Sequence, residues 1–162
     1  MSLMNVPPNM VHPVPGSVPP VYHTNWTPGD GSCLFSAFAK GLVQNHQGYV
    51  HPASVLRKEA VHWMGTYSEL FLPFVSVPDG VEQDQAFKDY LRRMSQPDAW
   101  GGELELKALS QTYKVNVGVL KRRDNHRHMW APSEDMVPGQ RTFWLYLSGN
   151  HYENLLAPSQ IL

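Results

Sequence analysis

The first half of the chain carries apolar residues at the three- and four-residue spacing of helices with one buried face. The first such stretch predicts a helix over residues 33–43, whose apolar side is Leu34, Phe35, Phe38, Ala39 and Leu42. The second predicts a helix over residues 54–72, whose buried stripe is Val55, Leu56, Ala60, Trp63, Met64 and Leu70. Pro73 and Pro78 are expected to end that helix. A third helix, over residues 81–94, is more polar, which favours a place at the surface.

The second half of the chain changes to the two-residue alternation that is typical of strands. One more helix comes first, over residues 103–113, with Leu106 and Leu109 facing inward. A strand is predicted where valines alternate with other residues, at Val115, Asn116, Val117, Gly118 and Val119. A long polar connection over residues 121–140 then leads to a second strand, RTFWLYLS. A Gly-Asn turn separates that strand from a third, HYENLLA.

Helices early in the chain and a short sheet late in it, with no repeating strand–helix–strand order, indicate the α+β class. We therefore expect the helix at residues 33–43 to pack, together with the other helices, against a small and mainly antiparallel sheet. Residues 1–24 are rich in proline, which blocks helices and favours extended chain. We interpret them as a leader or linker, and residues 25–162 as one folded domain, which suits a chain with 42% hydrophobic residues.

Composition and charge narrow the possible functions. The net charge of −1 gives no reason to expect a nucleic-acid partner, and the short basic run at residues 121–123 is interpreted as a solvated loop. No apolar run is long enough to span a bilayer, so no membrane partner is expected. A single cysteine excludes an internal disulfide and is typical of an intracellular, cytoplasmic protein. His126 and His128 have no cluster of further ligands beside them, so no metal is expected.

That single cysteine, Cys33, stands between the turn-forming stretch PGDGS and the first helix. A lone cysteine is often a small buried apolar residue, but its position before a helix favours a nucleophile. The free N–H groups at a helix start favour a thiolate and lower the pKa of a cysteine there. The amides of the same loop, from Asp30 to Cys33, are also placed to bind an oxyanion during acyl transfer.

A nucleophilic cysteine needs a base, and His151 is the best placed of the eight histidines. It follows an apolar strand and the turn at residues 149–150, and another strand continues from it. A histidine at the edge of a rigid sheet is able to point toward the start of a helix. Judged alone, it would be interpreted as a surface residue beside a turn.

Three stretches of the sequence resemble the ovarian-tumour (OTU) family of cysteine proteases, which are deubiquitinating enzymes. GDGSCLFSAF is similar to the nucleophile motif of the family, and WGGELELKALSQTYKVNVGV resembles its middle block. GNHYENLL resembles the closing block, which holds the general base. The three occur in the order of the family and cover about residues 25–156. One block alone would be weak evidence, whereas three in order are specific.

This resemblance implies a papain-like fold and a thiol hydrolase that cleaves after the C-terminal Gly-Gly of ubiquitin or a ubiquitin-like modifier. No cofactor is implied. By position in the motifs, Cys33 is the nucleophile, His151 the general base and Asp30 an active-site residue. The loop of Asp30, Gly31, Ser32 and Cys33 is expected to supply the oxyanion-binding amides. Trp100 and Trp144 are candidates to line a narrow channel for the two glycines of the substrate.

The residue that orients the histidine departs from the pattern of the family, which often has Asp or Asn two positions after it. Here that position is Glu153, and Asn154 comes next. Residues i and i+2 of a strand share a face, so Glu153 is preferred, ahead of Asp30 and then Asn154. A Cys-His pair without a third member is also open.

Two further interpretations remain beside a deubiquitinase. OTU-like domains also occur in viral polyproteins, so the chain is compatible with a protease that processes its own polyprotein, with or without deubiquitinase activity, in the host cytoplasm. The glutamate at position 153 is the one feature that favours an inactive ubiquitin-binding module.

Overall fold

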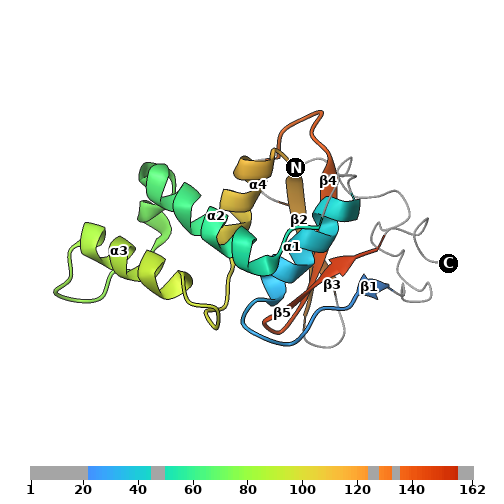
Figure 1. Ribbon diagram of the computed structural model, residues 1–162, viewed down its shortest axis with the longest axis horizontal. Coiled ribbons are helices and arrows are strands. Elements are labelled where there is room, and N and C mark those ends of the chain that lie inside the picture. Colours follow the sequence, from blue (N-terminus) through green and yellow to red (C-terminus); the bar gives the residue numbers. More distant parts are fainter. Residues whose placement is uncertain (1–21, 45–49, 124–127, 133–135, 157–162) are drawn as a thin grey trace.

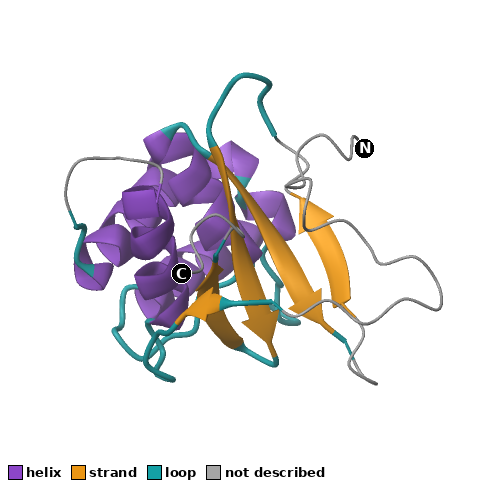
Figure 2. Cartoon of the chain, turned by 90° about the vertical axis from the view of Figure 1, so that its right-hand side faces the viewer, coloured by secondary structure: helices purple, strands orange, loops and turns teal. Residues whose placement is uncertain are grey.

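The computed structural model describes residues 22–44, 50–123, 128–132 and 136–156. Helices and strands form two layers, with the helices against one face of a sheet (Figures 1 and 2). The longer helices are α1 (Cys33–Gln44), α2 (Ala53–Thr66), α3 (Gln83–Met94) and α4 (Glu103–Tyr113). The strands are β1 (Thr24–Asn25), β2 (Asn116–Arg122), β3 (His128–Pro132), β4 (Thr142–Ser148) and β5 (His151–Leu155). The predicted α+β class is therefore confirmed.

The five strands lie in the order β1-β5-β4-β2-β3. Neighbours pair antiparallel except β2 and β4, which are parallel, so the sheet is mainly antiparallel, as predicted. β2 is a central strand, and residues 116–120 are buried on both of its faces. The turn between β4 and β5 places Ser148 opposite His151, and the other end of β5 pairs with β1.

The main core lies between the helices and the sheet. The ring of Phe38 in α1 meets the ring of Phe143 in β4 edge-on, with 5.0 Å between the ring centroids. Gly41 lies directly over the same Phe143 ring, so α1 approaches the sheet closely there. The opposite face of the sheet has a smaller core of Leu120, Trp144 and Leu155, covered in part by Tyr22, Met136 and Tyr146.

The second helix is shorter than its apolar pattern predicted. It ends at Thr66, and the chain continues in two short 3₁₀ helices, η3 (Ser68–Leu70) and η4 (Leu72–Phe74). Leu56, Ala60 and Met64 are buried as predicted, but Val55 and Leu70 are exposed. Leu70 lies beyond the end of α2, so the helical spacing no longer determines which way it faces. Pro73 lies within η4 rather than at the end of a long helix.

Two strands were not predicted from the sequence. β3 lies within the stretch that we expected to be a polar connection, and it pairs with β2 from Gly118 to Arg122. Lys121 and Arg122 are therefore strand residues, not part of a solvated loop. β1 has only two residues and pairs with β5, so the sheet begins at Thr24. Residues 1–21 of the proline-rich leader lie outside the described residues.

Candidate active site

Cys33 is the first residue of α1, and its side chain is 1% exposed. Its sulfur lies against the start of β5, 3.5 Å from the amide nitrogen of Tyr152 and 3.7 Å from the carbonyl oxygen of Asn150. The Tyr152 amide donates a hydrogen bond to the sulfur. The two residues that contact the sulfur flank His151 in the sequence. The structure thus brings the predicted nucleophile and the predicted base to the same end of the molecule, where α1 packs on β5.

Burial decides the protonation of the Cys33 thiol. Desolvation raises the pKa of this thiol, and the nearby charge of Asp30 raises it further. Hydrogen bonds from the backbone of Tyr152 and Leu34 act in the opposite direction but do not outweigh the burial. The start of a helix alone predicted a lowered pKa, so this part of the sequence interpretation is wrong for the resting site. Burial thus works against a thiolate in the resting site, and the proton is left for a base to remove.

The loop before Cys33 already uses two of its four amides. The amide of Ser32 donates to Oδ1 of Asp30 at 3.0 Å, and the amide of Cys33 donates to the carbonyl oxygen of Asp30 at 3.2 Å. Asp30 is therefore the residue that folds this loop back on itself. Within the part of the chain that the structure describes, the amides of Asp30 and Gly31 have no hydrogen-bond partner.

His151 is the first residue of β5, and its ring is partly buried. Its Nε2 lies 3.5 Å from Oε2 of Glu153. The other ring nitrogen, Nδ1, is buried and has no hydrogen-bond partner among the described residues. The glutamate thus lies beside one nitrogen of the ring, and the second nitrogen stays available. This agrees with the prediction from strand parity that Glu153 shares the side of His151.

Asn154 and Asp30, the other two candidates to orient the histidine, make different contacts. The side-chain nitrogen of Asn154 donates to Oε1 of Gln44, in the last turn of α1, at 3.1 Å. Asp30 has its carboxylate on the Ser32 amide. Neither is placed beside the ring of His151 by any contact in the described chain.

The sequence did not reveal what holds Glu153. Its Oε1 accepts a hydrogen bond from the hydroxyl of Thr24 in β1 at 2.8 Å, and its Oε2 accepts one from the amide of Thr27 at 3.2 Å. The buried Thr27 hydroxyl also donates to the carbonyl of Tyr152 at 2.6 Å. We call residues 24–27 the N-terminal strap. Thr and Asn are common in loops, so only the pairing of β1 with β5 identifies the function of this segment.

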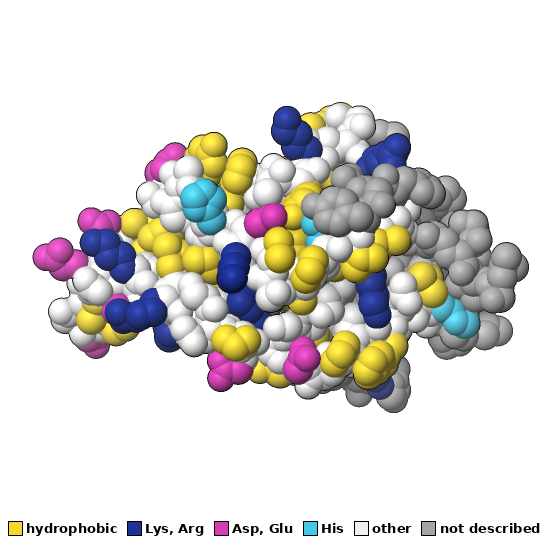
Figure 3. All heavy atoms as spheres, in the orientation of Figure 1, with side chains coloured by type: hydrophobic (Ala, Val, Ile, Leu, Met, Phe, Trp, Pro, Cys, Tyr) yellow, Lys and Arg dark blue, Asp and Glu magenta, His cyan; other side chains and the backbone are white. Residues whose placement is uncertain are grey.

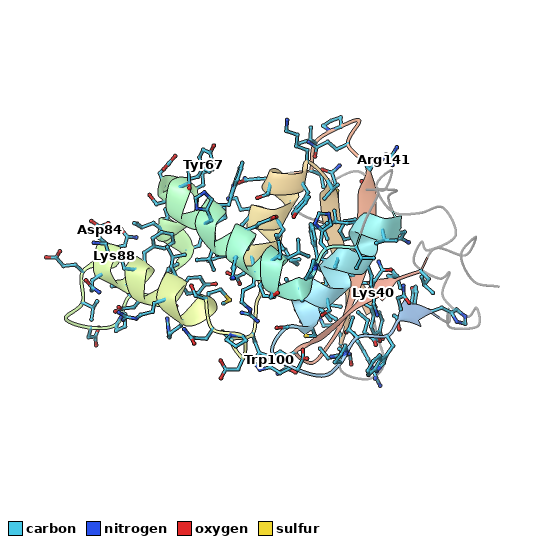
Figure 4. All side chains as sticks on the ribbon, in the orientation of Figure 1. Lys40, Tyr67, Asp84, Lys88, Trp100 and Arg141 are labelled. Atoms are coloured by element: carbon cyan, nitrogen blue, oxygen red, sulfur yellow. The ribbon has the colours of Figure 1, made fainter. Side chains whose placement is uncertain are left out.

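The two tryptophans predicted to line a channel lie in different surroundings. Trp100 is 43% exposed and precedes Gly101, which packs against Leu34 and Phe35 next to Cys33. Figure 4 shows Trp100 at the lower edge of the view, near the start of α1. Trp144 is 3% exposed and packs in the core on the face of the sheet away from α1. The expectation that it lines a channel is therefore corrected, because it is a core residue.

Outside this site, the described residues form no metal site and no membrane-spanning helix, and the face in Figure 3 shows no charged patch. Basic and acidic side chains are interspersed over the face shown in Figure 3, with no large area of one sign. No group of three His, Cys, Asp or Glu side chains within the described ranges is close enough to hold a metal ion. No helix in the described part of the chain is long and apolar enough to cross a membrane.

The structure thus places a buried thiol at the start of a helix and packs it against a strand that begins with a histidine beside a carboxylate. Cysteine hydrolases combine a thiol, an imidazole and an orienting polar group in their active sites. Comparison with known families agrees, because the model of the OTU-like cysteine proteases matches residues 28–152. The chain belongs to this family.

Curated relatives with this domain are much longer than the chain. OTU domain-containing protein 4 of Homo sapiens is 28% identical over 127 residues, which are 76% of this chain and 10% of that protein. The deubiquitinase OTUD6B of Xenopus laevis is 35% identical over 97 residues, which are 58% of this chain and 32% of that protein. The chain thus spans about a tenth to a third of the length of these relatives.

Solved structures share the fold at low sequence identity. The OTU domain of OTUD1 superposes with a TM-score of 0.66 at 20% identity, over 84% of this chain and 86% of that one. An OTU deubiquitinase from Wolbachia pipientis wMel, solved bound to ubiquitin, has a TM-score of 0.62 at 19% identity, over 86% of this chain and 98% of that one. These similarities confirm the predicted OTU fold.

Proposed function

We propose that this domain is a thiol-dependent deubiquitinase that acts inside cells, with Cys33 as nucleophile and His151 as general base. The observation that carries the proposal is the contact of the Cys33 sulfur with the backbone on either side of His151. Membership of the OTU-like cysteine protease family supports thiol-dependent hydrolysis of a peptide bond. Relatives named deubiquitinases support ubiquitin as the substrate class. The hydrolysed bond is the peptide or isopeptide bond after the C-terminal glycine of ubiquitin or a ubiquitin-like modifier.

In the first half of the reaction, His151 removes the thiol proton as the sulfur attacks the carbonyl carbon of that glycine. Nδ1 is the ring atom that remains free to accept this proton, because Nε2 lies beside Glu153. The tetrahedral intermediate collapses to a thioester, and His151 returns the proton to the leaving lysine amine. Burial raises the pKa of Cys33, so the attack depends on His151 to accept the thiol proton.

The second half reverses the roles of the same groups. Water attacks the thioester carbonyl while His151 takes one proton from it, and the thiol leaves with that proton. The second proton of the water passes to solvent when the product acid ionises to the ubiquitin carboxylate. The negative oxygen of both tetrahedral intermediates needs donors close to Cys33. The free amides of Asp30 and Gly31 support this role, whereas those of Ser32 and Cys33 are already donated within the loop.

Glu153 is our choice for the residue that orients the ring of His151. A carboxylate beside Nε2 favours the tautomer with its proton on that atom, which leaves the lone pair of Nδ1 for the thiol. Its own position is fixed by Thr24 and Thr27, so the extra methylene relative to aspartate does not leave the side chain loose. The 3.5 Å separation is long for a hydrogen bond, and we expect it to shorten when the imidazolium forms.

Kinetics of two neighbouring variants test this choice. Glu153→Gln keeps the size of the side chain but removes its charge, and we expect kcat to fall by roughly tenfold to a hundredfold, a part of the ~10²–10⁴-fold that acid–base catalysis contributes as a whole. Asn154→Ala removes the contact with Gln44, so we expect a small loss of stability with kcat unchanged. The reverse pattern would assign the orienting role to Asn154.

Covalent labelling tests the proposed function as a whole. We would treat the domain with two electrophilic probes, one built on ubiquitin and one on a ubiquitin-like modifier, and use Cys33→Ala as the control. We expect a probe adduct with the wild-type domain and none with the variant, and the faster probe identifies the modifier. Adducts in both proteins would contradict Cys33 as the nucleophile.

No labelling of a folded sample would favour the two remaining interpretations. Noncovalent binding of ubiquitin without labelling is the result expected of an inactive binding module. Cleavage of a segment of its own parent chain, without a reaction with either probe, is the result expected of a polyprotein protease.

A further inference from the structure

Arg57, in α2, is buried beneath the loop that carries Cys33. The residue is 3% exposed, and its guanidinium carbon lies 4.5 Å from the centre of the Phe35 ring, in the first turn of α1. An arginine is almost never this buried unless its donors are satisfied. Both terminal nitrogens of this guanidinium have acceptors.

The two terminal nitrogens of Arg57 join two segments that are far apart in the sequence. Nη2 donates to the carbonyl oxygen of Gly31 at 3.0 Å and to Oγ of Ser32 at 3.2 Å, both in the loop before Cys33. The remaining acceptors are at the end of α3 and in the connection that follows it. They are the carbonyl oxygens of Met94 at 3.0 Å, Pro97 at 3.1 Å and Ala99 at 2.8 Å, and the sulfur of Met94 at 3.7 Å.

The same two segments also touch directly. The hydroxyl of Ser32 donates to the carbonyl oxygen of Pro97 at 3.1 Å. A side chain at Gly31 would place its Cβ 2.4 Å from the carbonyl oxygen of Asp98, so only glycine permits this approach of two backbones. The nucleophile loop is thus packed on a neighbouring loop, and the planar fork of Arg57 ties both together.

We propose that Arg57 is a positioning residue, which fixes the direction in which the amides of the nucleophile loop point. A peptide group is planar, so a guanidinium that holds the Gly31 carbonyl also sets the plane of the Gly31–Ser32 peptide. The free amide of Gly31 lies in the preceding peptide, whose carbonyl oxygen, that of Asp30, accepts from the amide of Cys33. Hydrogen bonds thus hold both peptides that meet at Gly31, and Arg57 holds the second of them. This inference rests on the proposed function, because it assumes a reaction that develops negative charge at this loop.

The charge of Arg57 suits this role better than a neutral donor would. Its acceptors are backbone carbonyls, one hydroxyl and the sulfur of Met94, so its hydrogen bonds to oxygen are charge-assisted. Among the residues that the structure describes, no carboxylate forms an ion pair that would compete for the fork. Burial lowers the pKa of the guanidinium, and the carboxylates of Glu105, Asp98 and Asp30 counteract that effect. Lysine, with one nitrogen, is unable to reach both loops in the same geometry.

Kinetics of Arg57→Met, Arg57→Lys and the control Arg92→Met test the inference. Arg92 in α3 has a side chain that is 74% exposed and pairs with Asp89, so its variant should match the wild-type domain. For Arg57→Met we expect kcat for a ubiquitin substrate to fall by roughly tenfold to a hundredfold, since small misplacements of reacting groups cost that much. KM should change little, because the ubiquitin surface is not touched, and Arg57→Lys should recover part of kcat.

Two further readouts separate positioning from loss of folding. All rates are divided by the fraction of folded molecules at the assay temperature, which the thermal unfolding curve of each variant gives. Ser32→Ala keeps the loop amide but removes the hydroxyl that links Arg57 to Pro97, and we expect a severalfold lower kcat at unchanged melting temperature. If Arg57→Met does not fold, Ser32→Ala decides alone, and a wild-type kcat for it overturns the inference.

A folded Arg57→Met with wild-type kcat also overturns the inference, and so does a loss confined to melting temperature. These outcomes differ from failure of the proposed function. If the proposed function is wrong, the wild-type domain itself will neither cleave the ubiquitin substrate nor react with the ubiquitin probe.

Discussion

Two opposing effects act on the pKa of the Cys33 thiol. The start of α1 and the Tyr152 amide stabilise a thiolate, whereas burial and the nearby carboxylate of Asp30 oppose it. Burial has the largest effect, so the pKa of the thiol is raised. The reactivity of the site therefore depends on the base and on the arrival of substrate rather than on a thiolate that exists beforehand.

The pH dependence of alkylation tests this conclusion. The rate with iodoacetamide follows the fraction of thiolate, which rises about tenfold per pH unit below the pKa of the thiol. Because burial raises that pKa, we expect the rate in the folded domain to keep rising past the pH at which an ordinary cysteine, with a pKa of ~8.5, levels off.

The unfolded chain is the matched control for this experiment, since Cys33 is the only cysteine. In denaturant the same thiol should titrate at the ordinary value, below that of the folded domain. A folded domain whose alkylation levels off at a lower pH than the unfolded chain would instead indicate a thiolate–imidazolium pair in the resting site.

Individual site residues differ in how well the sequence predicts them. Cys33 and His151 stand in short motifs next to turn signals, so their surroundings are local in the sequence. Strand parity was enough to prefer Glu153 over Asn154. The roles of Thr24 and Arg57 depend on partners more than 20 positions away, such as Glu153 and Gly31, and no local pattern encodes such contacts.

The sequence predicted the helices and strands in which apolar residues recur at regular spacing, and it missed the strands that lack such spacing. The helix at residues 103–113 has the predicted bounds, and the first helix differs by one residue. β1 has two residues, which is too short for any alternation, and β3 lies in a polar stretch. Both are edge strands of the sheet, where one neighbour rather than an apolar core determines the structure.

The packing of α1 on β4 depends on a glycine. A Cβ on Gly41 would lie 2.2 Å from the ring of Phe143, which is buried and has little room to move. We expect Gly41→Ala to lower the free energy of unfolding by about 1–3 kcal/mol, the usual effect of overpacking. The melting temperature should fall by about 2–8 °C, measured by calorimetry.

Gly65 in α2 provides the control, since its Cβ would meet nothing closer than Leu91 at 3.5 Å, an ordinary contact. Gly65→Ala should leave the melting temperature unchanged or raise it, because alanine favours a helix by up to ~1 kcal/mol over glycine. Equal effects of the two substitutions would show that α1 and β4 do not approach as closely as the structure has them.

At the scale of the whole molecule, the catalytic arrangement joins segments from both ends of the domain. The N-terminal strap pairs with β5 and holds Glu153, and Leu156 donates to the carbonyl of His23 at 2.9 Å. The strap residue Thr24 and its partner Glu153 both lie just outside the stretch, residues 28–152, that matches the family. The candidate site therefore depends on contacts between the first and the last strand of the chain.

Truncation of the leader tests where the working domain begins. We propose that it begins at β1, so a chain of residues 22–162 should keep kcat and melting temperature close to those of the full chain. A chain of residues 26–162 loses Thr24 and with it the hydrogen bond to Oε1 of Glu153. Hydrogen bonds to charged groups contribute about 1.5–3 kcal/mol, so we expect kcat to fall by roughly tenfold or more.

Thr24→Val in the full chain separates that bond from the rest of the truncated segment, because it removes the hydroxyl but keeps a residue that favours strands. It should reproduce most of the loss of kcat with little change in melting temperature. If the chain of residues 26–162 kept full kcat, Glu153 would not need β1. The Thr27 amide, which survives the truncation, would then be the donor that fixes the glutamate beside His151.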